Sequence, residues 1–294
     1  MTVLVTGGTG SFGHAYIRSI YGTERIRVLS RDEEKQRLMA LEFPDVHYVL
    51  GDVRDRDSVR RAMRGITHVF HAAALKQVPQ SEANPGETVR TNILGTENVC
   101  IEAQEAGARV VLLSTDKAVE PVGVMGASKF IAEQLTTSYG YNVVRYGNVV
   151  GSRGSIVPLF RSLIRAGKPI TVTDPTMTRF LISLPEAVEL VTTAMADTDP
   201  LAPGRIFVRK SPAATVAQIV RVMAPDHPVE TIGIRPGEKR HEHLILPHER
   251  AVDKGDYFII DPRVARAGIA YSSETAPRLT DAALAALIED APDV

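Results

Sequence analysis

The sequence predicts an α/β fold: a doubly wound parallel sheet followed by a smaller C-terminal lobe. Two observations predict this class. Over the first 150 residues, short β-branched runs alternate with longer amphipathic stretches, as in consecutive βαβ units. After about residue 150 prolines become frequent and the alternation weakens. We therefore expect one domain over residues 1–150, and over 151–294 mainly a second lobe, with some segments that return to the sheet.

The first domain is expected to contain six strands and the helices between them. Short runs rich in β-branched or apolar residues are typical of strands buried in a parallel sheet. The expected strands are Thr2–Thr6, Ile26–Leu29, Val46–Leu50, Thr67–His71, Arg109–Ser114 and Tyr141–Tyr146. The expected helices are Ser11–Tyr21, Asp32–Leu41, Asp55–Arg64, Gly86–Ala106 and Gly126–Ser138. In the second lobe we expect the helices Ile156–Ala166, Pro185–Ala196 and Thr215–Met223, and a surface helix at Thr280–Glu289.

The composition excludes several classes of protein. The 34 Lys+Arg balance 35 Asp+Glu, so the net charge of −1 gives no electrostatic basis for binding nucleic acid or a membrane surface. The single cysteine, Cys100, excludes an intrachain disulfide framework and a cysteine-based zinc site. No apolar run approaches the ~20 residues of a membrane span, and no secretion signal is recognised. A cytoplasmic, globular protein is expected.

A glycine-rich turn follows the first expected strand. Glycines stand at Gly7, Gly10 and Gly13, between that strand and the first expected helix. Gly7 permits the tight turn, Gly10 lets a pyrophosphate approach the backbone, and Gly13 permits close packing of helix on sheet. The helix N-terminus adds free N–H groups and positive potential for phosphate. The turn predicts that residues 1–150 form a Rossmann-type dinucleotide-binding domain, which leaves substrate binding mainly to the second lobe.

The choice of cofactor is expected to depend on the end of the second strand, where Ser30, Arg31 and Asp32 follow one another and Lys35 lies one helical turn on. Arg31 can hold a phosphate with two hydrogen bonds, and Lys35 can add a point charge. NADP is therefore favoured, and NAD stays possible because Asp32 could bind a ribose hydroxyl. Asp52, after the third strand, could reach the adenine amine.

Several blocks of the sequence resemble extended short-chain dehydrogenases/reductases. More narrowly they resemble the bacterial UDP-N-acetylglucosamine 4,6-dehydratases of polysaccharide biosynthesis. The resemblance covers most of residues 1–245, and its narrowest motifs are the Ser-Thr-Asp-Lys and Ser-Arg-Gly-Ser blocks. The matching blocks are Thr6–Gly13, Ser30–Asp32, Gly51–Asp55, His71–Lys76, Thr91–Asn92, Leu113–Ala118, Arg145–Val149, Gly151–Ser155, Thr178–Phe180 and Gly237–Lys239.

The sequence departs from the superfamily at the catalytic tyrosine. Most members have Tyr-x-x-x-Lys, whereas this chain has Met125 four residues before Lys129. A thioether has no proton to give, so Met125 cannot accept the proton of a sugar 4-hydroxyl. General acid–base catalysis contributes about 10²–10⁴-fold. Methionine also occurs here in a branch of the dehydratases, so the resemblance holds. Asp116, or a water held by Thr115 and Lys129, is expected to accept the proton.

The resemblance implies a role for each residue that follows the fifth strand. Lys117 is the expected base at C5 and Asp116 the acid at O6, with Thr115 near the 4-hydroxyl and Lys129 on the nicotinamide ribose. Asp116 then needs a raised pKa and Lys117 a lowered one. Direct contact between the two charges would oppose both shifts, so we expect the side chains to diverge or to titrate as a coupled pair.

The remaining candidates bind the cofactor or the nucleotide sugar. Arg153 and Arg179 can hold a diphosphate, and Asn148 and Glu238 can bind a phosphate or ribose hydroxyls. The expected cofactor contacts are Gly7, Thr9, Gly10, Ser11, Phe12, Gly13, Ser30, Arg31, Lys35, Asp52, Val53, Ala72, Ala73, Ala74, Lys76, Asn92 and Lys129. The expected substrate contacts are Lys76, Asn148, Arg153, Arg179 and Glu238.

No metal site is expected. His241, Glu242 and His248 fit no zinc spacing and are interpreted as a solvated loop. His71, at the end of the fourth strand, is interpreted as structural.

The leading hypothesis is a UDP-N-acetylglucosamine 4,6-dehydratase that oxidises C4 transiently, eliminates water across C5–C6 and returns the hydride to C6. The alternatives are a 5,6-dehydratase that returns the hydride to C4, a nucleotide-sugar epimerase, and a non-catalytic NADP-binding sensor. An acid beside O6 favours elimination over epimerisation. The resemblance also implies a homodimer or larger homo-oligomer, formed partly through the apolar face of residues 86–106.

Overall fold

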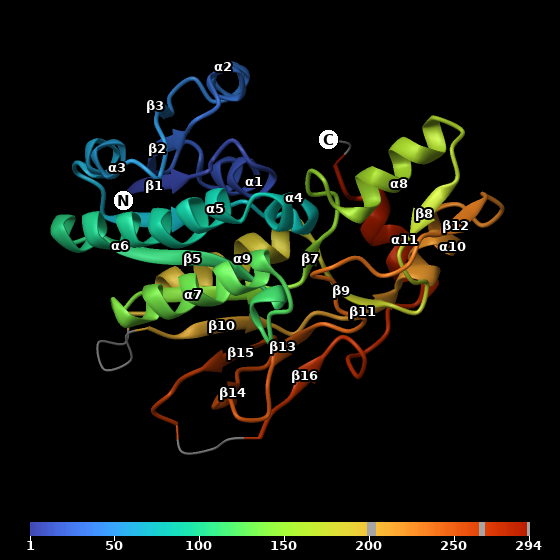
Figure 1. Cartoon of the computed structure of the whole chain (residues 1–294). Coiled ribbons are helices and arrows are strands. Elements are labelled where there is room, and N and C mark those ends of the chain that lie inside the picture. The colour runs from blue at the N-terminus through green and yellow to red at the C-terminus, as the bar shows by residue number, and fades with distance from the viewer. Residues whose placement is uncertain (199–203, 265–267, 293–294) are drawn as a thin grey trace.

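The computed structural model describes residues 1–198, 204–264 and 268–292. Its main sheet is formed by β1 (Thr2–Thr6), β2 (Arg25–Ser30), β3 (His47–Leu50), β4 (His68–His71), β5 (Arg109–Thr115), β6 (Asn142–Tyr146), β10 (Ile206–Arg209), β14 (Ala251–Asp253) and β15 (Tyr257–Ile260). The strand order is β14-β15-β10-β6-β5-β4-β1-β2-β3 (Figure 1). From β3 to β10 neighbouring strands are parallel, whereas β15 is antiparallel to both its neighbours. The predicted α/β fold with a parallel central sheet is confirmed.

Helices cover both faces of this sheet. The principal ones are α1 (Ser11–Ile20), α2 (Glu33–Glu42), α3 (Arg56–Met63), α6 (Gly95–Ala106), α7 (Val124–Ser138) and α9 (Leu184–Ala196). Helices α3, α6 and α7 contact one another in sequence on one face, while α1 and α9 meet on the other (Figure 1). The sheet is therefore the middle layer of three.

The first strand shows why both faces must be covered. Successive side chains of a strand point to opposite faces. Val3 and Val5 belong to the core cluster that includes Tyr16 of α1, while Leu4 belongs to the cluster that includes Val59 of α3. All of these side chains are buried. A strand with three consecutive buried apolar residues, Val3, Leu4 and Val5, needs a layer of helices on each face of the sheet.

The long helix expected over Gly86–Ala106 is divided. Helix α4 (Val78–Ala83) precedes α5 (Pro85–Thr88), which runs into a π-helical segment, η1 (Val89–Leu94), and then into α6. The π-helical segment contains Asn92, one of the predicted cofactor contacts. The apolar pattern predicted a helical region here. It did not predict the π-helical turn, in which the backbone hydrogen bonds span five residues instead of four.

The second half of the chain builds smaller sheets beside the main one and also returns to it. One small sheet joins β7 (Asn148–Val149), β9 (Thr178–Ile182) and β11 (Ala213–Thr215). Two others pair β8 (Ile170–Val172) with β12 (Val229–Thr231), and β13 (His243–Ile245) with β16 (Tyr271–Ser272). Strands β10, β14 and β15 come from the same half and extend the main sheet. The division into two domains stays a prediction.

Three helices pack in this second half: α8 (Ile156–Arg165), α10 (Val216–Met223) and α11 (Asp281–Glu289). The helix expected on the surface at Thr280–Glu289 is present as α11, but it is not a purely surface helix. Leu284 and Ile288 are buried in one cluster with Ile219 of α10. Among the residues that the structure describes, no helix has the length and apolar content needed to cross a lipid bilayer.

Candidate active site

The candidate site lies at the carboxyl edge of the main sheet. The strand order reverses between β1 and β4, because β2 and β3 lie on one side of this pair and β5, β6 and β10 on the other. Open α/β sheets bind ligands in the crevice that such a reversal leaves. The glycine-rich loop after β1 and residues 115–117 after β5 both lie at this edge.

The glycine-rich loop has the tight shape that its spacing predicts. Gly7 has a φ of +66°, and a Cβ there would lie 2.8 Å from the backbone of Ala73. A Cβ at Gly13 would lie 2.4 Å from the Cα of Gly8, so α1 packs directly on the loop. Gly10 is the N-cap of α1, and no side chain accepts a hydrogen bond from the first N–H groups of the helix at this cap. These N–H groups can therefore bind a phosphate. The loop therefore fits a dinucleotide cofactor.

Side chains around the loop tie it to neighbouring segments. Thr9 Oγ1 lies 2.9 Å from Ser30 Oγ at the end of β2. Ser11 Oγ accepts a hydrogen bond of 3.0 Å from the backbone N–H of Arg153, in the second half of the chain. Phe12 packs against the core cluster below the loop. The predicted cofactor contacts of Thr9, Ser11, Phe12 and Ser30 stay predictions.

The residues expected to select the cofactor are joined by ion pairs. Lys35 Nζ donates to Asp32 Oδ2 at 2.6 Å, and Asp32 Oδ1 caps α2 by accepting from the Lys35 N–H. Arg31 is 54% exposed, with one guanidinium nitrogen 3.7 Å from Asp52 Oδ2. Asp52 also accepts hydrogen bonds from Arg54. Asp32, whose position left NAD open, thus serves as a helix cap and as the ion-pair partner of Lys35.

The segment after β4 forms the wall opposite the glycine-rich loop. Ala72, Ala73 and Ala74 are half-buried, and the backbone of Ala73 contacts Gly7. Asn92 is buried and holds the same segment, because it donates to the Leu75 carbonyl at 2.9 Å and accepts from the Leu75 N–H at 2.8 Å. This exchange fixes the backbone that leads to Lys76.

Two more of the predicted contacts near this wall differ in their surroundings. Val53 is buried and packs against the first residue of α6. Lys76 keeps an exposed surface, but the burial of its amine and the positive charge of Arg153 lower its pKa. Lys76 and Arg153 therefore lie close enough to act on the same anion.

Residues 115–117 bring the predicted acid and base into direct contact. Asp116 is completely buried, and its Oδ1 accepts from Lys117 Nζ at 3.0 Å and from Thr115 Oγ1 at 2.9 Å. Its Oδ2 is buried and has no hydrogen-bond partner among the described residues. The expectation that the two side chains diverge is wrong. The charges of the two side chains act on each other's pKa, and their titration as a coupled pair stays a prediction.

Burial and neighbouring charges shift both pKa values upward. Burial raises the pKa of Asp116, since it disfavours the carboxylate more than Lys117 favours it. For Lys117, burial acts to lower the pKa, but the carboxylates of Asp116 and Glu242 together outweigh it and raise the pKa. The upward shift of the Asp116 pKa favours the neutral form that the predicted acid needs, whereas the pKa of Lys117 shifts in the direction opposite to that expected of a resting base.

Met125 and Lys129 lie one turn apart in α7, and both are buried. Lys129 Nζ donates to the Leu113 carbonyl of β5 at 2.7 Å. Burial lowers the pKa of Lys129 to about 8, although Glu133 acts against the shift. Lys129 therefore lies under the same strand that carries the Asp116–Lys117 pair, with a neutral form accessible near neutral pH.

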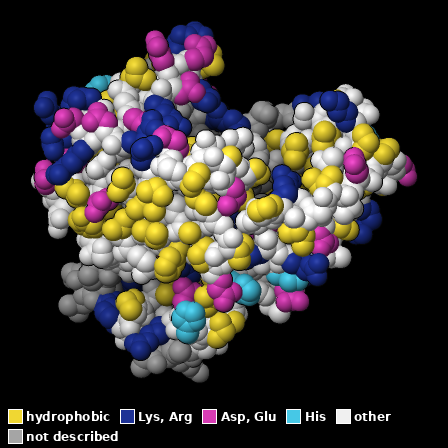
Figure 2. All heavy atoms as spheres, viewed as in Figure 1, with side chains coloured by type: hydrophobic (Ala, Val, Ile, Leu, Met, Phe, Trp, Pro, Cys, Tyr) yellow, Lys and Arg dark blue, Asp and Glu magenta, His cyan; other side chains and the backbone are white. Residues whose placement is uncertain are grey.

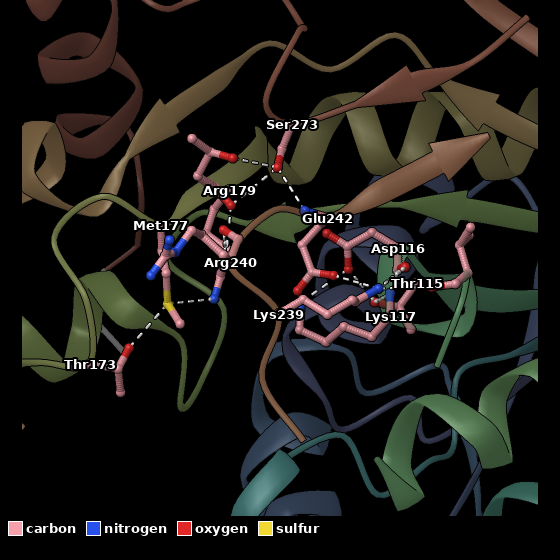
Figure 3. A network of polar contacts seen from close by, with 12 residues as sticks. Thr115, Asp116, Lys117, Thr173, Met177, Arg179, Lys239, Arg240, Glu242 and Ser273 are labelled. Carbon is pink, nitrogen blue, oxygen red and sulfur yellow. Dashed lines mark hydrogen bonds and ion pairs between the residues drawn. The ribbon is translucent and has the colours of Figure 1, made fainter. Parts of the chain in front are cut away.

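The sequence analysis assigned no role to two charged side chains that lie beside the Asp116–Lys117 pair. The expectation of a solvated loop at residues 241–248 is wrong for Glu242, which is 1% exposed. Glu242 Oε1 lies 3.4 Å from Lys117 Nζ, and Lys239 Nζ lies 2.9 Å from Glu242 Oε2 (Figure 3). Lys239 also donates to the Val119 carbonyl at 2.8 Å. The flanking residues 238–243 are almost all polar, so no apolar pattern could have signalled this burial.

Besides Lys76, the residues predicted to contact the nucleotide sugar lie in different surroundings. Arg179 is buried and donates to the carbonyls of Thr178 and Arg240, and its charge acts on Lys117 and Glu242 (Figure 3).

Glu238 is half-buried and accepts from the backbone N–H of Arg235 at 3.3 Å. Asn148 Oδ1 is buried without a hydrogen-bond partner among the described residues. A buried amide oxygen that is left unpaired is costly, which favours Asn148 as a ligand contact.

Arg153 lies with the cofactor loop. Its guanidinium donates to the Thr9 carbonyl, and its charge acts on both Lys76 and Asp32. The structure therefore separates the two predicted arginines: Arg179 joins the Asp116–Lys117 pair, and Arg153 joins the glycine-rich loop.

These features define the chain as an enzyme with the extended short-chain dehydrogenase/reductase fold. The structure is similar to that of Pen from Bacillus thuringiensis, with 35% identity, coverage of 98% of this chain and 97% of the other, and a TM-score of 0.92. It also shares its fold with a double mutant of the dTDP-glucose 4,6-dehydratase DesIV from Streptomyces venezuelae, solved with NAD bound. That comparison gives 22% identity, coverage of 81% and 86%, and a TM-score of 0.73.

Residues 3–261 match the model of the family described as "Polysaccharide biosynthesis protein", and the chain belongs to this family. A curated relative from Rickettsia canadensis (strain McKiel), named UDP-glucose 4-epimerase, is 46% identical over 88% of this chain and 82% of its own length. Family membership therefore confirms the predicted class, an enzyme of the nucleotide-sugar epimerase and dehydratase superfamily.

Proposed function

We propose that this protein is a UDP-N-acetylglucosamine 4,6-dehydratase. The observation that carries the proposal is the completely buried carboxyl of Asp116, which has one oxygen unpaired and the other on Lys117 Nζ, at the ligand edge of the sheet. An elimination across C5–C6 needs an acid at O6 and an amine at C5 side by side. An epimerisation at C4 needs no acid beside O6, so burial of such an acid supports elimination.

NADP is the proposed cofactor, with NAD as the alternative. A bound nicotinamide supplies the hydride acceptor and donor of the reaction. Arg31 is exposed just after β2 and can reach a 2′-phosphate, because its ion pair with Asp52 is long, at 3.7 Å. The first turn of α1 and the cations Lys76 and Arg153 suit the remaining phosphates, with Lys129 on the nicotinamide ribose.

The affinities for NADP and NAD test the cofactor. Arg31→Ala should weaken NADP binding by at least ~10-fold, the effect of one charge-assisted contact of about 1.5 kcal/mol or more, and should leave NAD binding unchanged. Arg37→Ala, an exposed arginine of α2 paired with Glu34, is the matched control. Equal binding of both cofactors by the unaltered protein would establish NAD as a full alternative.

The residues of the chain then divide the proton transfers. Lys117, once neutral, takes the C5 proton, and Asp116 gives its proton to O6 as water leaves. Met125 has no proton to exchange, so the 4-hydroxyl needs another acceptor. Because burial favours the neutral form of Asp116, we favour a water held by Thr115 and Lys129 over Asp116 itself. Asn148, Arg179 and Glu238 are the proposed contacts to the nucleotide sugar.

Incubation with UDP-N-acetylglucosamine in deuterated water tests the reaction. A 4-keto-6-deoxy sugar with deuterium at C5 supports the proposal, and an exocyclic alkene identifies a 5,6-dehydratase instead. Asp116→Asn should slow water loss by about 10²–10⁴-fold, whereas Asp57→Asn, at an exposed carboxylate of α3, should not. NADP binding without any turnover would support a sensor.

A UDP-sugar 4-epimerase is the second candidate, because the curated relative described above carries that type of name. It predicts a C4 epimer that retains hydrogen at C5 and a rate that survives Asp116→Asn. The product and the variant therefore separate the two candidates in one experiment.

A homodimer formed through η1 and α7 is also proposed. Figure 2 shows hydrophobic side chains gathered over these helices. Val89, Leu94, Phe130 and Ile131 are 41–46% exposed on η1 and α7, which contact each other. An exposed apolar patch of this kind marks an interaction surface. Light scattering should show a dimer that Ile131→Asp dissociates, and a monomeric unaltered protein would refute the proposal. A cytoplasmic location stays a prediction that cell fractionation can test.

A further inference from the structure

Glu242 is held rigidly against the acid–base pair from a distant part of the chain. Its backbone N–H donates to Ser273 Oγ at 2.8 Å, and its carbonyl accepts from the Ser273 N–H at 2.7 Å. These bonds fix Glu242 just before β13, with its carboxylate toward Lys117 (Figure 3). Lys117 Nζ thus has a carboxylate on each side: Asp116 at 3.0 Å and Glu242 at 3.4 Å.

We infer that Glu242 is a positioning residue of the proposed dehydration: it is the counter-ion that lets Asp116 stay protonated, and it takes the proton that Lys117 must lose to become a base. Only the role of Glu242 as proton acceptor rests on the proposed function. Its role as counter-ion concerns the resting protein, whichever sugar the protein binds.

The charges around Glu242 explain the resting state. Burial acts to raise the pKa of Glu242, but Lys117, Lys239 and Arg179 together outweigh it and lower the pKa. The ionised form of Glu242 is therefore favoured beside Lys117, and its negative charge adds to the burial that raises the pKa of Asp116. These four residues and Asp116 are the charged groups that face one another across residues 115–117, β9 and residues 239–242.

When Asp116 and Lys117 form an ion pair by themselves, they hold one titratable proton between them. With the ionised Glu242 as a third group, two such protons can be held. At rest Asp116 and Lys117 hold the two protons and Glu242 holds none. Transfer of a proton from Lys117 to Glu242 leaves a neutral amine beside a neutral acid, which is the state that the elimination needs. Lys239 and Arg179 favour the ionised Glu242, so this is the minor form.

The cycle closes without a change in total charge. The neutral Lys117 takes the C5 proton and becomes an ammonium, while Asp116 gives its proton to O6 and becomes a carboxylate. Lys117 then passes a proton to Asp116 across 3.0 Å, and Glu242 returns its proton to Lys117 across 3.4 Å. These transfers reset the three groups after the elimination, and the water carries away the proton given to O6. The return of the hydride to C6 then takes a proton at C5 from Lys117, and the proton that left the 4-hydroxyl replaces it.

Infrared spectroscopy tests the resting state without any substrate. The unaltered protein at neutral pH should show a protonated-carboxyl band that is lost in Asp116→Asn. Glu242→Gln should also lose it, because Asp116 then becomes the counter-ion of Lys117. Glu242→Asp keeps the charge and should keep the band. Glu249→Gln is the matched control, since it removes a carboxylate from the following loop that pairs with Arg145 instead of Lys117. A band that persists in Glu242→Gln would overturn the counter-ion role.

Single-turnover kinetics test the relay. In Glu242→Gln, oxidation at C4, followed by the absorbance of the reduced nicotinamide, should stay within about threefold of the unaltered protein. Deuterium exchange at C5 and water loss should slow by about 100-fold or more, in the range of general acid–base catalysis, with partial recovery in Glu242→Asp. Water loss at the original rate in Glu242→Gln would overturn the relay. If the unaltered protein forms no 4-keto-6-deoxy sugar, the dehydratase proposal and the relay fail together, while the infrared comparison still decides the counter-ion role.

Discussion

His71 should make the free energy of unfolding of the protein depend on pH. It ends β4 and lies between two threonines, with Nδ1 2.6 Å from Thr6 Oγ1 and Nε2 3.0 Å from Thr96 Oγ1. The ring is 1% exposed. Burial, with a contribution from the positive charge of Lys129, lowers the pKa of His71 from 6.5 to about 3. The folded protein therefore contains a neutral imidazole at any pH above about 3.

The magnitude follows from the two pKa values. Between pH 6.5 and about 3 the unfolded chain binds a proton at His71 that the folded protein does not bind. The free energy of unfolding therefore falls as the pH is lowered through this window. One proton changes it by about 1.4 kcal/mol per pH unit, so lowering the pH from about 6.5 to about 4 removes about 3 kcal/mol.

Urea unfolding of the unaltered protein and of His71→Gln, at neutral pH and near pH 4, measures this contribution. Glutamine keeps a donor and an acceptor for the two threonines but does not titrate in this range. We expect the unaltered protein to lose about 3 kcal/mol more than His71→Gln between the two pH values. His47→Gln, at an exposed imidazole, is the control and should follow the unaltered protein. Parallel losses, within about 1 kcal/mol, would refute the reasoning.

Three further variants test packing at the site. Glu133→Gln breaks the buried ion pair with Arg145, in which the side chains are 0% and 2% exposed and 2.6 Å apart. The free energy of unfolding should fall by about 3–5 kcal/mol. A fall in the melting temperature of less than about 4 °C would contradict this expectation. Met125→Leu should keep kcat within about threefold, because the thioether moves no proton and the volume is nearly unchanged; a loss of 100-fold would assign the sulfur a chemical role. Gly13→Ala places a Cβ 2.4 Å from the backbone of Gly8, so titration should show cofactor affinity at least ~10-fold weaker, equivalent to ~1.4 kcal/mol of strain, and unchanged affinity would show that the loop can shift.

Local patterns were enough to predict the elements that begin the site. The apolar run Thr2–Thr6 before Gly7 predicted a buried strand, a tight turn and a helix start, and all three are present. The run Arg109–Ser114 predicted another buried strand, which is present as β5 and is followed directly by Asp116 and Lys117. These inferences work because the period of a strand, the backbone freedom of glycine and the ends of parallel strands are all local properties of the chain.

The sequence could not predict contacts between segments that lie far apart along the chain. Residues 239–242 are polar and resemble a surface loop, yet the fold buries Glu242 beside Lys117, about 125 positions earlier. Arg153 was expected to hold a diphosphate together with Arg179, but the fold places its guanidinium on the carbonyl of Thr9. Nothing in the neighbouring residues distinguishes a solvated charge from one that a remote segment desolvates.

The sequence alone was enough to predict the α/β class of the fold, the glycine-rich turn after β1, and the place of Asp116 and Lys117 after β5. The tertiary structure alone decided how these groups are charged, because a pKa depends on burial and on neighbouring charges that other segments supply. The pairing of Asp116 with Lys117, and the arrival of Glu242 beside them, are results of that packing.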